Sequence, residues 1–309
     1  MSFLVELAQG AYPPNALDRF TPVQPFNSEN ALAMMWMAQL AYETAHEQKV
    51  TDILKSLNLT KRAFASNDPI TGFPPHSACV VVAGGRGATI VAFSGTDPLK
   101  IEDWITDFTA QRSVSDLHKG FEDAVTTVWP LVEAAIKNRP ADQKELFFTG
   151  HSLGGALATV AAARAALDPE TVATAVYTFG GPRVGGSAFS GDYTPMLGNR
   201  TYRLVDGGDI VPTVPPAAGG FLHVGESIQC PSDGRFDGAQ TRKNLAVDNK
   251  PDFLESTLAD GIADFRALAA FRFMRGIGPR PLDRLAVLLP RMVRDHVPSS
   301  YFRAFGVTL

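Results

Sequence analysis

A serine in the middle of the chain is flanked by glycines at a spacing that suits nucleophilic chemistry. The segment Gly150-His151-Ser152-Leu153-Gly154 has the pattern G-x-S-x-G. It follows a short apolar run, Leu146–Thr149, which is typical of a strand, and it precedes an alanine-rich run, which is typical of a helix. Because Gly150 and Gly154 lack side chains, strand and helix can approach closely and Ser152 can adopt a strained backbone conformation. The hydroxyl of Ser152 would then project from the sheet edge as a nucleophile.

A serine hydroxyl attacks a carbonyl only when a general base takes its proton, and the base needs an acid that orients it. A serine at a strand-to-helix turn is the nucleophile elbow of α/β-hydrolases, where the chain order is serine, acid, histidine. His223 and His296 are the histidines that follow Ser152. His296 lies in a polar C-terminal loop, where a mobile base is expected, whereas His223 lies in an apolar, strand-like run that indicates a buried structural histidine. We therefore prefer His296 as the base and keep His223 as the alternative.

Two aspartates compete for the role of the acid. Asp206 and Asp209 both follow Thr201–Val205, an apolar run typical of a strand, and the acid of this fold class lies in such a loop. Asp209 directly precedes Ile210-Val211-Pro212, a segment that would anchor it rigidly. We choose Asp209 as the orienting acid, with Asp206 as its rival.

The oxyanion that forms during acyl transfer needs two hydrogen-bond donors. One is the backbone N–H of Leu153, the residue directly after the nucleophile. The second is expected from the loop after an early strand, and Thr96 follows the apolar run Thr89–Phe93. Thr96 can offer both its N–H and its hydroxyl, so we predict an oxyanion hole built from Leu153 and Thr96.

Strand-like and helix-like segments alternate around these residues. Apolar runs predict strands at 79–83, 88–93, 146–149, 174–179 and 201–205. Apolar residues at helical spacing predict helices at 31–42, 50–57 and 122–137, with another from 153 onward. This alternation predicts an α/β fold with a largely parallel central sheet flanked by helices. We treat residues 1–309 as a single α/β-hydrolase domain.

Two further helical segments lie outside this alternation. Ile101, Trp104, Ile105 and Phe108 recur at helical spacing, which predicts a short amphipathic helix within residues 97–109. Its apolar face suits an apolar substrate. Residues 230–294, between the acid and the histidine, predict an extra C-terminal helical insertion. We favour a helical cap for this insertion, and its many arginines leave docking on anionic lipid surfaces as the alternative.

Composition excludes several classes of protein. The chain has 309 residues, of which 45% are hydrophobic and 19% are charged, and its net charge of −4 carries no nucleic-acid signature. Two cysteines in a chain of this length do not form a disulfide framework. The sequence shows neither a signal peptide nor an uninterrupted apolar stretch long enough to cross a membrane. We therefore expect a soluble protein without a transmembrane segment, and composition leaves its compartment and oligomeric state open.

Taken together, these residues resemble the class 3 lipase family, which includes the triacylglycerol lipases of filamentous fungi and their bacterial relatives. The resemblance runs from about Ser77 to Gln229 and returns at Asp295–Tyr301. Its matching blocks are Gly95-Thr96, Trp104 with Asp107, His118 with Gly120-Phe121, Gly150 to Gly155, Pro182-Arg183-Val184-Gly185, Asp209 with Val211-Pro212, His223 with Gly225, and Asp295-His296 with Tyr301.

The resemblance implies a role for each candidate residue. Ser152, Asp209 and His296 would form the triad, Thr96 and Leu153 the oxyanion hole, and His223 would be structural. The amphipathic helix around Trp104 would correspond to the lid, which in the family covers the site in water and moves aside at a lipid surface.

We therefore expect a lipase that hydrolyses carboxylic esters, with long-chain acylglycerols as substrates at a lipid–water interface and with no cofactor or metal ion. A phospholipase A1, or a feruloyl or short-chain carboxylesterase, could use the same residues. A non-catalytic lipid-binding relative is the alternative from another class, and the presence of Ser152, Asp209 and His296 together argues against it.

Overall fold

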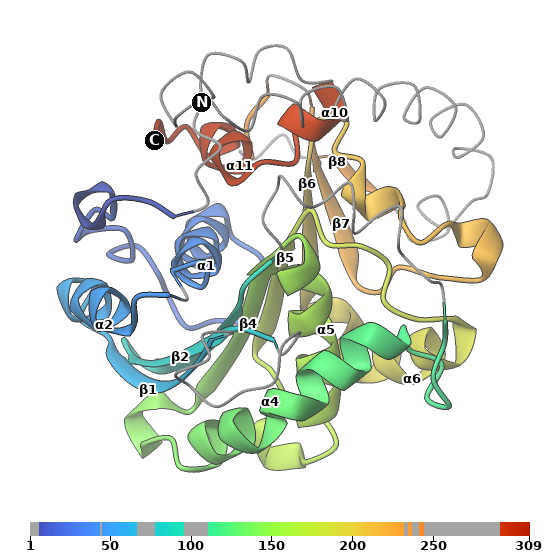
Figure 1. The fold of residues 1–309 in the computed structure, drawn as a ribbon, viewed down its shortest axis with the longest axis horizontal. Coiled ribbons are helices and arrows are strands. Elements are labelled where there is room, and N and C mark those ends of the chain that lie inside the picture. The colour runs from blue at the N-terminus through green and yellow to red at the C-terminus, as the bar shows by residue number, and fades with distance from the viewer. Residues whose placement is uncertain are drawn as a thin grey trace.

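An eight-stranded sheet forms the centre of the computed structural model (Figure 1). The structure describes residues 6–43, 45–66, 78–95, 111–231, 234–236, 241–243 and 291–309. In space the strands follow their order in the chain. They are β1 (Thr60–Ala65), β2 (Val80–Gly85), β3 (Ala88–Phe93), β4 (Glu145–His151), β5 (Ala175–Phe179), β6 (Thr201–Asp206), β7 (Glu226–Cys230) and β8 (Thr241–Lys243).

The pairing of the strands explains why the middle of the sheet is so apolar. The strands from β3 to β7 pair in parallel, whereas β1 with β2, β2 with β3, and β7 with β8 pair antiparallel. Parallel strands are buried on both faces, which makes β3 and β5 continuous apolar runs rather than alternating ones. The predicted largely parallel sheet flanked by helices is confirmed.

Helices cover the two faces of this sheet (Figure 1). They are α1 (Ser28–Leu40), α2 (Glu47–Ser56), α4 (Lys119–Lys137), α5 (Leu153–Ala165), α6 (Ser187–Leu197), α10 (Arg291–Arg294) and α11 (Pro298–Ala304). Single 3-10 turns lie at Gln9–Ala11, Ala141–Gln143, Pro169–Thr171, Gly198–Arg200, Val211–Thr213 and Ala217–Gly219.

Each face of the sheet has its own hydrophobic core. Phe147 of β4 packs with residues of α1, α2 and α11, together with the N-terminal segment. Its neighbour Phe148 points to the other face and packs with residues of α4, α5 and α6. Successive side chains of a strand alternate between faces. Strand β4 is therefore held from both sides, and with it the turn that carries Ser152.

The element boundaries differ from the sequence-based expectation in a few places. Strands β1, β7 and β8 and helices α6 and α11 were not predicted. The apolar run 221–225, expected to be strand-like, holds only an isolated bridge between Leu222 and Gly185, and strand pairing begins at Glu226. The positive φ of Gly225 (75°) ends that run. The predicted lid segment 97–109 and most of the insertion 230–294 lie outside the described residues.

Within the described part of the chain, no helix is both long and apolar enough to cross a membrane.

A buried carboxylate ties the N-terminal segment to the rest of the molecule. The Glu43 side chain is fully buried just after α1. Its Oε1 accepts hydrogen bonds from the Leu7 backbone N–H (2.8 Å) and the Tyr12 hydroxyl (2.7 Å), and its Oε2 accepts one from Lys49 Nζ (2.5 Å). Because three donors converge on one buried charge, removing that charge leaves them without a matched acceptor.

We therefore expect Glu43→Gln to lower the free energy of unfolding by about 2–4 kcal/mol, since it breaks a buried ion pair. Urea denaturation measures the change. Glu47→Gln is the matched control, because Glu47 forms an exposed ion pair with Lys61 and such pairs contribute about 0–1 kcal/mol. Equal losses in the two variants would contradict the role given to Glu43.

Candidate active site

Ser152 occupies a strained turn between β4 and α5. Its backbone has φ 58° and ψ −131°, a region that residues with side chains rarely adopt. A Cβ atom at Gly150 would overlap the carbonyl group of Gly154, and one at Gly154 would overlap the carbonyl oxygen of Phe93. The two glycines of the motif are therefore required by the close approach of strand and helix, as the sequence indicated. The turn holds Ser152 at the N-terminus of α5.

The structure brings Asp209 and His296 into direct contact. Nδ1 of His296 lies 2.8 Å from Oδ1 and 2.9 Å from Oδ2 of Asp209, and both side chains are buried. A carboxylate only accepts hydrogen bonds, so Nδ1 carries a proton, and in the neutral form of the ring Nε2 then has a lone pair. The Nε2 atom is buried and has no hydrogen-bond partner among the described residues, and the same holds for the Ser152 hydroxyl.

The serine turn and the Asp209–His296 pair meet at Gly180. The backbone N–H of Ser152 donates to the carbonyl of Phe179 (2.8 Å), and Gly180 follows directly. Gly180 has φ 58°, and a Cβ there would overlap Asp209 Oδ2 and lie 3.0 Å from His296 Nδ1. The ring of His151, beside Ser152 in the chain, lies 4.7 Å from the His296 ring. The three predicted residues are thus gathered at one sheet edge.

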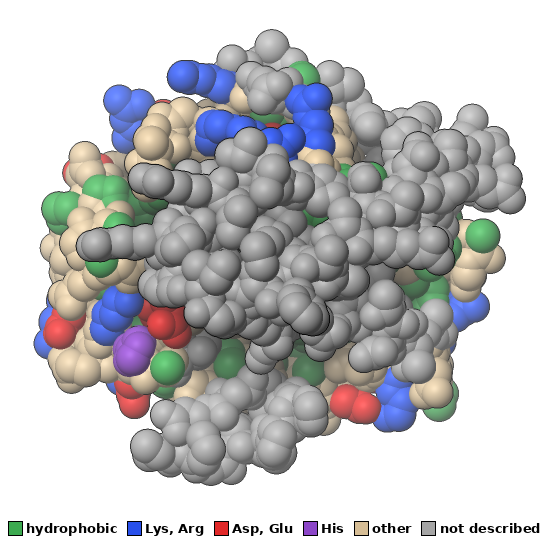
Figure 2. Space-filling view, turned by 45° about the horizontal axis from the view of Figure 1, so that its top comes forward, with side chains coloured by type: hydrophobic (Ala, Val, Ile, Leu, Met, Phe, Trp, Pro, Cys, Tyr) green, Lys and Arg blue, Asp and Glu red, His purple; other side chains and the backbone are tan. Residues whose placement is uncertain are grey.

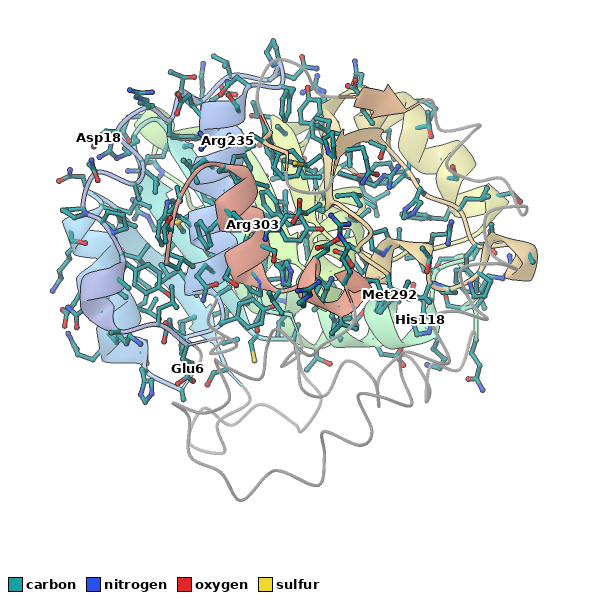
Figure 3. The ribbon with its side chains drawn as sticks, turned by 90° about the horizontal axis from the view of Figure 1, so that it is seen from above. Glu6, Asp18, His118, Arg235, Met292 and Arg303 are labelled. Atoms are coloured by element: carbon teal, nitrogen blue, oxygen red, sulfur yellow. The ribbon has the colours of Figure 1, made fainter. Side chains whose placement is uncertain are left out.

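The environment of His296 differs from the expectation in one respect. The sequence suggested a mobile polar loop, but the residue is 2% exposed in the turn between α10 and α11. Figure 3 looks down on these helices, with Met292 of α10 and Arg303 of α11 labelled on either side of this turn. The reason is that apolar and aromatic neighbours of His296 in this segment are themselves buried, so the turn packs against the core. These residues are Val293, Val297, Tyr301 and Phe302.

Tyr301 supports the carboxylate of Asp209, a role that the sequence did not reveal. Its hydroxyl donates to Asp209 Oδ2 at 2.6 Å, and the Val211 N–H donates to Oδ1 at 2.9 Å. Burial, followed by the charge of Asp209, raises the pKa of Tyr301 well above its ordinary value, so the phenol stays protonated and remains a donor. Asp209 therefore accepts hydrogen bonds from three groups that fix the orientation of its carboxylate. The sequence shows that Tyr301 follows His296 by five residues, but it does not show that Tyr301 contacts Asp209.

Asp206, the rival acid, has a different neighbour. Its Oδ2 lies 3.6 Å from Nη2 of Arg303 and has no hydrogen-bond partner within the described ranges. Burial, reinforced by the charge of Asp295 and opposed by Arg303, raises the pKa of Asp206 to about 7. The position three residues later, at Asp209, is the one that contacts the imidazole.

His223, the rival base, lies in a different setting. Its Nε2 donates to the carbonyl of Pro212 at 2.8 Å, and the residue is 3% exposed. Burial, followed by the charges of Arg203 and Arg183, lowers its pKa well below the ordinary value. A neutral, buried and hydrogen-bonded histidine fits the structural role given to it.

The predicted oxyanion hole is described in part. Leu153 is the first residue of α5, so its N–H has no acceptor one turn earlier within the helix. Thr96 lies outside the described residues, as do Ile101, Trp104, Ile105 and Phe108. Gly95 is described, and a Cβ there would lie 2.6 Å from the carbonyl oxygen of His151 and 3.1 Å from Cβ of Ser152. The chain that leads to Thr96 thus passes directly beside the serine turn.

Charged residues border the turn that carries His296. Asp295 Oδ2 accepts from the Gly208 N–H at 2.8 Å and lies 3.9 Å from Nε of Arg291. Figure 2 shows Lys and Arg side chains gathered along the upper edge of the molecule. Among the described residues, no group of three or more His, Cys, Asp or Glu side chains is placed to hold a metal ion. A strained serine, an imidazole whose Nε2 has no partner among the described residues, and a carboxylate held by several donors are the parts of a nucleophilic acyl-transfer site.

Comparisons with known proteins agree with this chemistry. Residues 90–219 match the family described as Lipase (class 3). The sequence is 32% identical over 195 residues to the secreted mono- and diacylglycerol lipase 1 of Fusarium solani, covering 60% of this chain and 54% of that protein. It is 36% identical over 159 residues to a lipase of Rhizomucor miehei, covering 48% of this chain and 43% of that protein. The chain therefore spans about half the length of these curated relatives.

A solved structure has a similar fold. It is a triacylglycerol lipase whose catalytic centre is formed by a serine protease triad. The TM-score is 0.52 at 26% sequence identity, covering 64% of this chain and 80% of that chain. This similarity and the parallel sheet of the present structure establish the α/β-hydrolase fold.

The raised pKa of Asp206 predicts a pH-dependent stability. In the unfolded chain its carboxyl titrates near the ordinary value of 3.8, whereas in the folded protein it titrates at about 7. Between these pH values the unfolded chain has lost a proton that the folded protein keeps, so stability falls as the pH rises through this window and levels off above it. Asp206→Asn has no such proton. We expect the Tm of Asp206→Asn, relative to wild type, to be about 2 °C or more higher at pH 8 than at pH 4.

Calorimetry at the two pH values measures this difference. Asp123→Asn is a suitable control, because Asp123 is an exposed carboxylate of α4 paired with Lys119. Its Tm relative to wild type should change little between the two pH values. A constant offset for Asp206→Asn would show that the folded protein does not retain the proton.

Proposed function

We propose that this chain, which belongs to the class 3 lipase family, hydrolyses carboxylic ester bonds of acylglycerols through an acyl-enzyme intermediate. Ser152 is the nucleophile, His296 the general base and Asp209 the acid that orients it. The observation that carries the proposal is the buried contact between His296 Nδ1 and Asp209, which leaves Nε2 free at the site that also holds the strained serine.

The proposed reaction follows from the protonation states of these groups. Nε2 of His296 takes the proton from the Ser152 hydroxyl as its oxygen attacks the ester carbonyl. The N–H of Leu153 and the donors of Thr96 stabilise the oxyanion. His296, now an imidazolium, donates its proton to the leaving alcohol. Water then attacks the acyl-enzyme by the same route and releases the fatty acid.

Asp209 stabilises the charged imidazolium without taking its proton. Three donors bind the carboxylate, from His296, Tyr301 and the Val211 backbone. These donors hold the carboxylate oxygens beside Nδ1, so the Asp209 side chain stays in place while His296 is charged. This arrangement supports a pair of charges that forms only in the transition state and in the tetrahedral intermediate.

The acylglycerol substrate rests on the relatives and on the apolar residues predicted for the segment 97–109. A phospholipase A1 or a feruloyl or short-chain carboxylesterase would use the same triad. The acyl and alcohol parts of the substrate distinguish these activities, so a series of esters separates them.

We expect wild-type protein to hydrolyse p-nitrophenyl esters with a maximum at medium or long acyl chains. Ser152→Ala and His296→Ala should each lower kcat by about 10³-fold or more, and Asp209→Asn by about 10³–10⁴-fold, because each removes one member of a cooperating set. Initial rates for chains from C2 to C16 provide the measurement. A maximum at the shortest chains would indicate a small-ester esterase, and hydrolysis that persists in Ser152→Ala would refute the proposal.

The apolar residues of the segment 97–109 generate a second expectation. Trp104→Ala and Ile105→Ala should lower the rate on emulsified triacylglycerol several-fold more than the rate on a dissolved short-chain ester, since an apolar face of a lid matters at a lipid surface. Both rates are measured on the same preparations. Equal losses on the two substrates would exclude a lid that acts at the interface.

A further inference from the structure

His151, the residue before the nucleophile, is completely buried and uses both ring nitrogens. Nε2 lies 2.7 Å from the backbone carbonyl oxygen of His296, and Nδ1 lies 2.7 Å from the Tyr42 hydroxyl. Its ring also lies against the His296 ring, with centroids 4.7 Å apart and planes inclined by 33°. The proposed reaction assigns no proton transfer to His151. Its side chain instead contacts the general base His296, Tyr42 and, edge-on, the ring of Tyr301 at 5.4 Å between centroids.

The partners of His151 determine its tautomer. A backbone carbonyl only accepts hydrogen bonds, so Nε2 must carry a proton. Burial, followed by repulsion from His296 when that ring is protonated, lowers the pKa of His151 well below its ordinary value, which keeps the His151 ring neutral with a single proton. Nδ1 therefore has a lone pair and accepts the O–H of Tyr42. The direction of the chain of hydrogen bonds is thus from Tyr42 to His151 to the carbonyl of His296.

We propose that Tyr42 and His151 are positioning residues that fix the backbone of His296, so that its imidazole is held between two anchors. Asp209 holds the ring at Nδ1, and His151 holds the main chain of the same residue through the carbonyl oxygen. Displacements of about 1 Å in a catalytic group can reduce rates by about 10²-fold.

Tyr42 extends this support to the other side of the nucleophile. It lies two residues after the end of α1, and a Cβ at Gly95 would overlap its hydroxyl oxygen. Gly95 ends the described segment after β3 and immediately precedes Thr96. One phenol thus lies against the turn that leads to the proposed oxyanion donor and also donates to the histidine that holds the base. The segment that follows α1 thereby contributes to the site without supplying a reacting group.

The inference rests on the proposed function, and matched substitutions separate positioning from mere stability. In glutamine the amide nitrogen is as many bonds from Cα as Nε2 is in histidine, so His151→Gln keeps a donor directed at the His296 carbonyl. In asparagine the amide corresponds instead to Nδ1, so His151→Asn keeps only a group directed at Tyr42. Both substitutions replace the ring by an amide. The difference between them is therefore whether the hydrogen bond to the His296 carbonyl is kept.

On a dissolved p-nitrophenyl ester we expect His151→Asn to lower kcat by about 10- to 100-fold, with KM changed by less than about twofold. His151→Gln should recover kcat to within about threefold of wild type. Tyr42→Phe should lower kcat by about three- to tenfold. Its control is Tyr193→Phe, which removes another buried phenol hydrogen bond, to Thr201 at 2.7 Å, and should leave kcat within about twofold.

A proton NMR measurement tests the positioning without any substrate. The Nδ1 proton of His296, shared with Asp209, should give a downfield resonance in the wild-type protein, assigned by its absence in His296→Ala. We expect this resonance to broaden or disappear in His151→Asn, through faster exchange with water, and to return in His151→Gln.

The outcomes distinguish the two proposals. Equal kcat values for the Asn and Gln variants, or equal effects of Tyr42→Phe and Tyr193→Phe, would overturn the positioning role, as would a resonance unchanged in His151→Asn. A wild-type protein that hydrolyses no ester would instead overturn the proposed function, and the NMR comparison would still decide whether His151 holds His296.

Discussion

The site depends on a carboxylate that is buried away from water. A charge in that position is tolerated only when donors surround it, because desolvation without compensation is unfavourable by several kcal/mol. For Asp209 these donors come from three places in the chain: the Val211 N–H from the same loop, the Tyr301 hydroxyl from α11 and the His296 ring from the turn before α11. Satisfying the charge therefore requires the C-terminal helix to pack against the end of β6, and this packing delivers the base to the serine.

The serine is fixed by a different constraint, which is close packing of backbone. Strand β4 is held by hydrophobic cores on both faces, through Phe147 on one side and Phe148 on the other. Helix α5 approaches so closely that side chains at Gly150 and Gly154 would overlap neighbouring backbone atoms. Because interiors pack to crystalline density, the strand cannot shift to relieve the strained conformation of Ser152. The two hydrophobic cores thus hold the backbone of Ser152 in its strained conformation, which places the hydroxyl at the site.

The two constraints meet in residues that supply no reacting atom. Gly180 offers the space in which Asp209, Tyr301 and His296 approach one another, and His151 joins the strand of the nucleophile to the main chain of the base. The segment that follows the N-terminal helix α1 enters the same network through Tyr42. Residues more than 100 positions apart in the chain are therefore coupled through short buried hydrogen bonds, whose strength is increased by the low local dielectric.

The sequence by itself determined the features that depend on local patterns. The apolar run before Gly150 and the alanine-rich run after it predicted β4, α5 and the turn that carries Ser152, because strand and helix periodicities and glycine spacing are local properties. The order of residues after the serine favoured Asp209 and His296, and the structure places these two in contact. The segments 97–109 and most of 230–294, where a lid and a helical insertion were predicted, stay predictions.

Tertiary structure alone decided which groups surround the triad. The hydrogen bond from Tyr301 to Asp209 joins residues 92 positions apart, and the one from His151 to His296 joins residues 145 positions apart. The spacing of apolar residues along the chain cannot predict such distant pairs. The polar composition of residues 295–301 suggested an exposed loop, whereas packing of the neighbouring Val297 and Phe302 buries His296. Residues 221–225 form only an isolated bridge with Gly185 and no strand. An apolar run becomes a strand only where a neighbouring strand lies beside it in space. The local sequence determines which residues can act as nucleophile, base and acid. The burial of a charged side chain and its hydrogen-bond partners depend on how distant elements pack together.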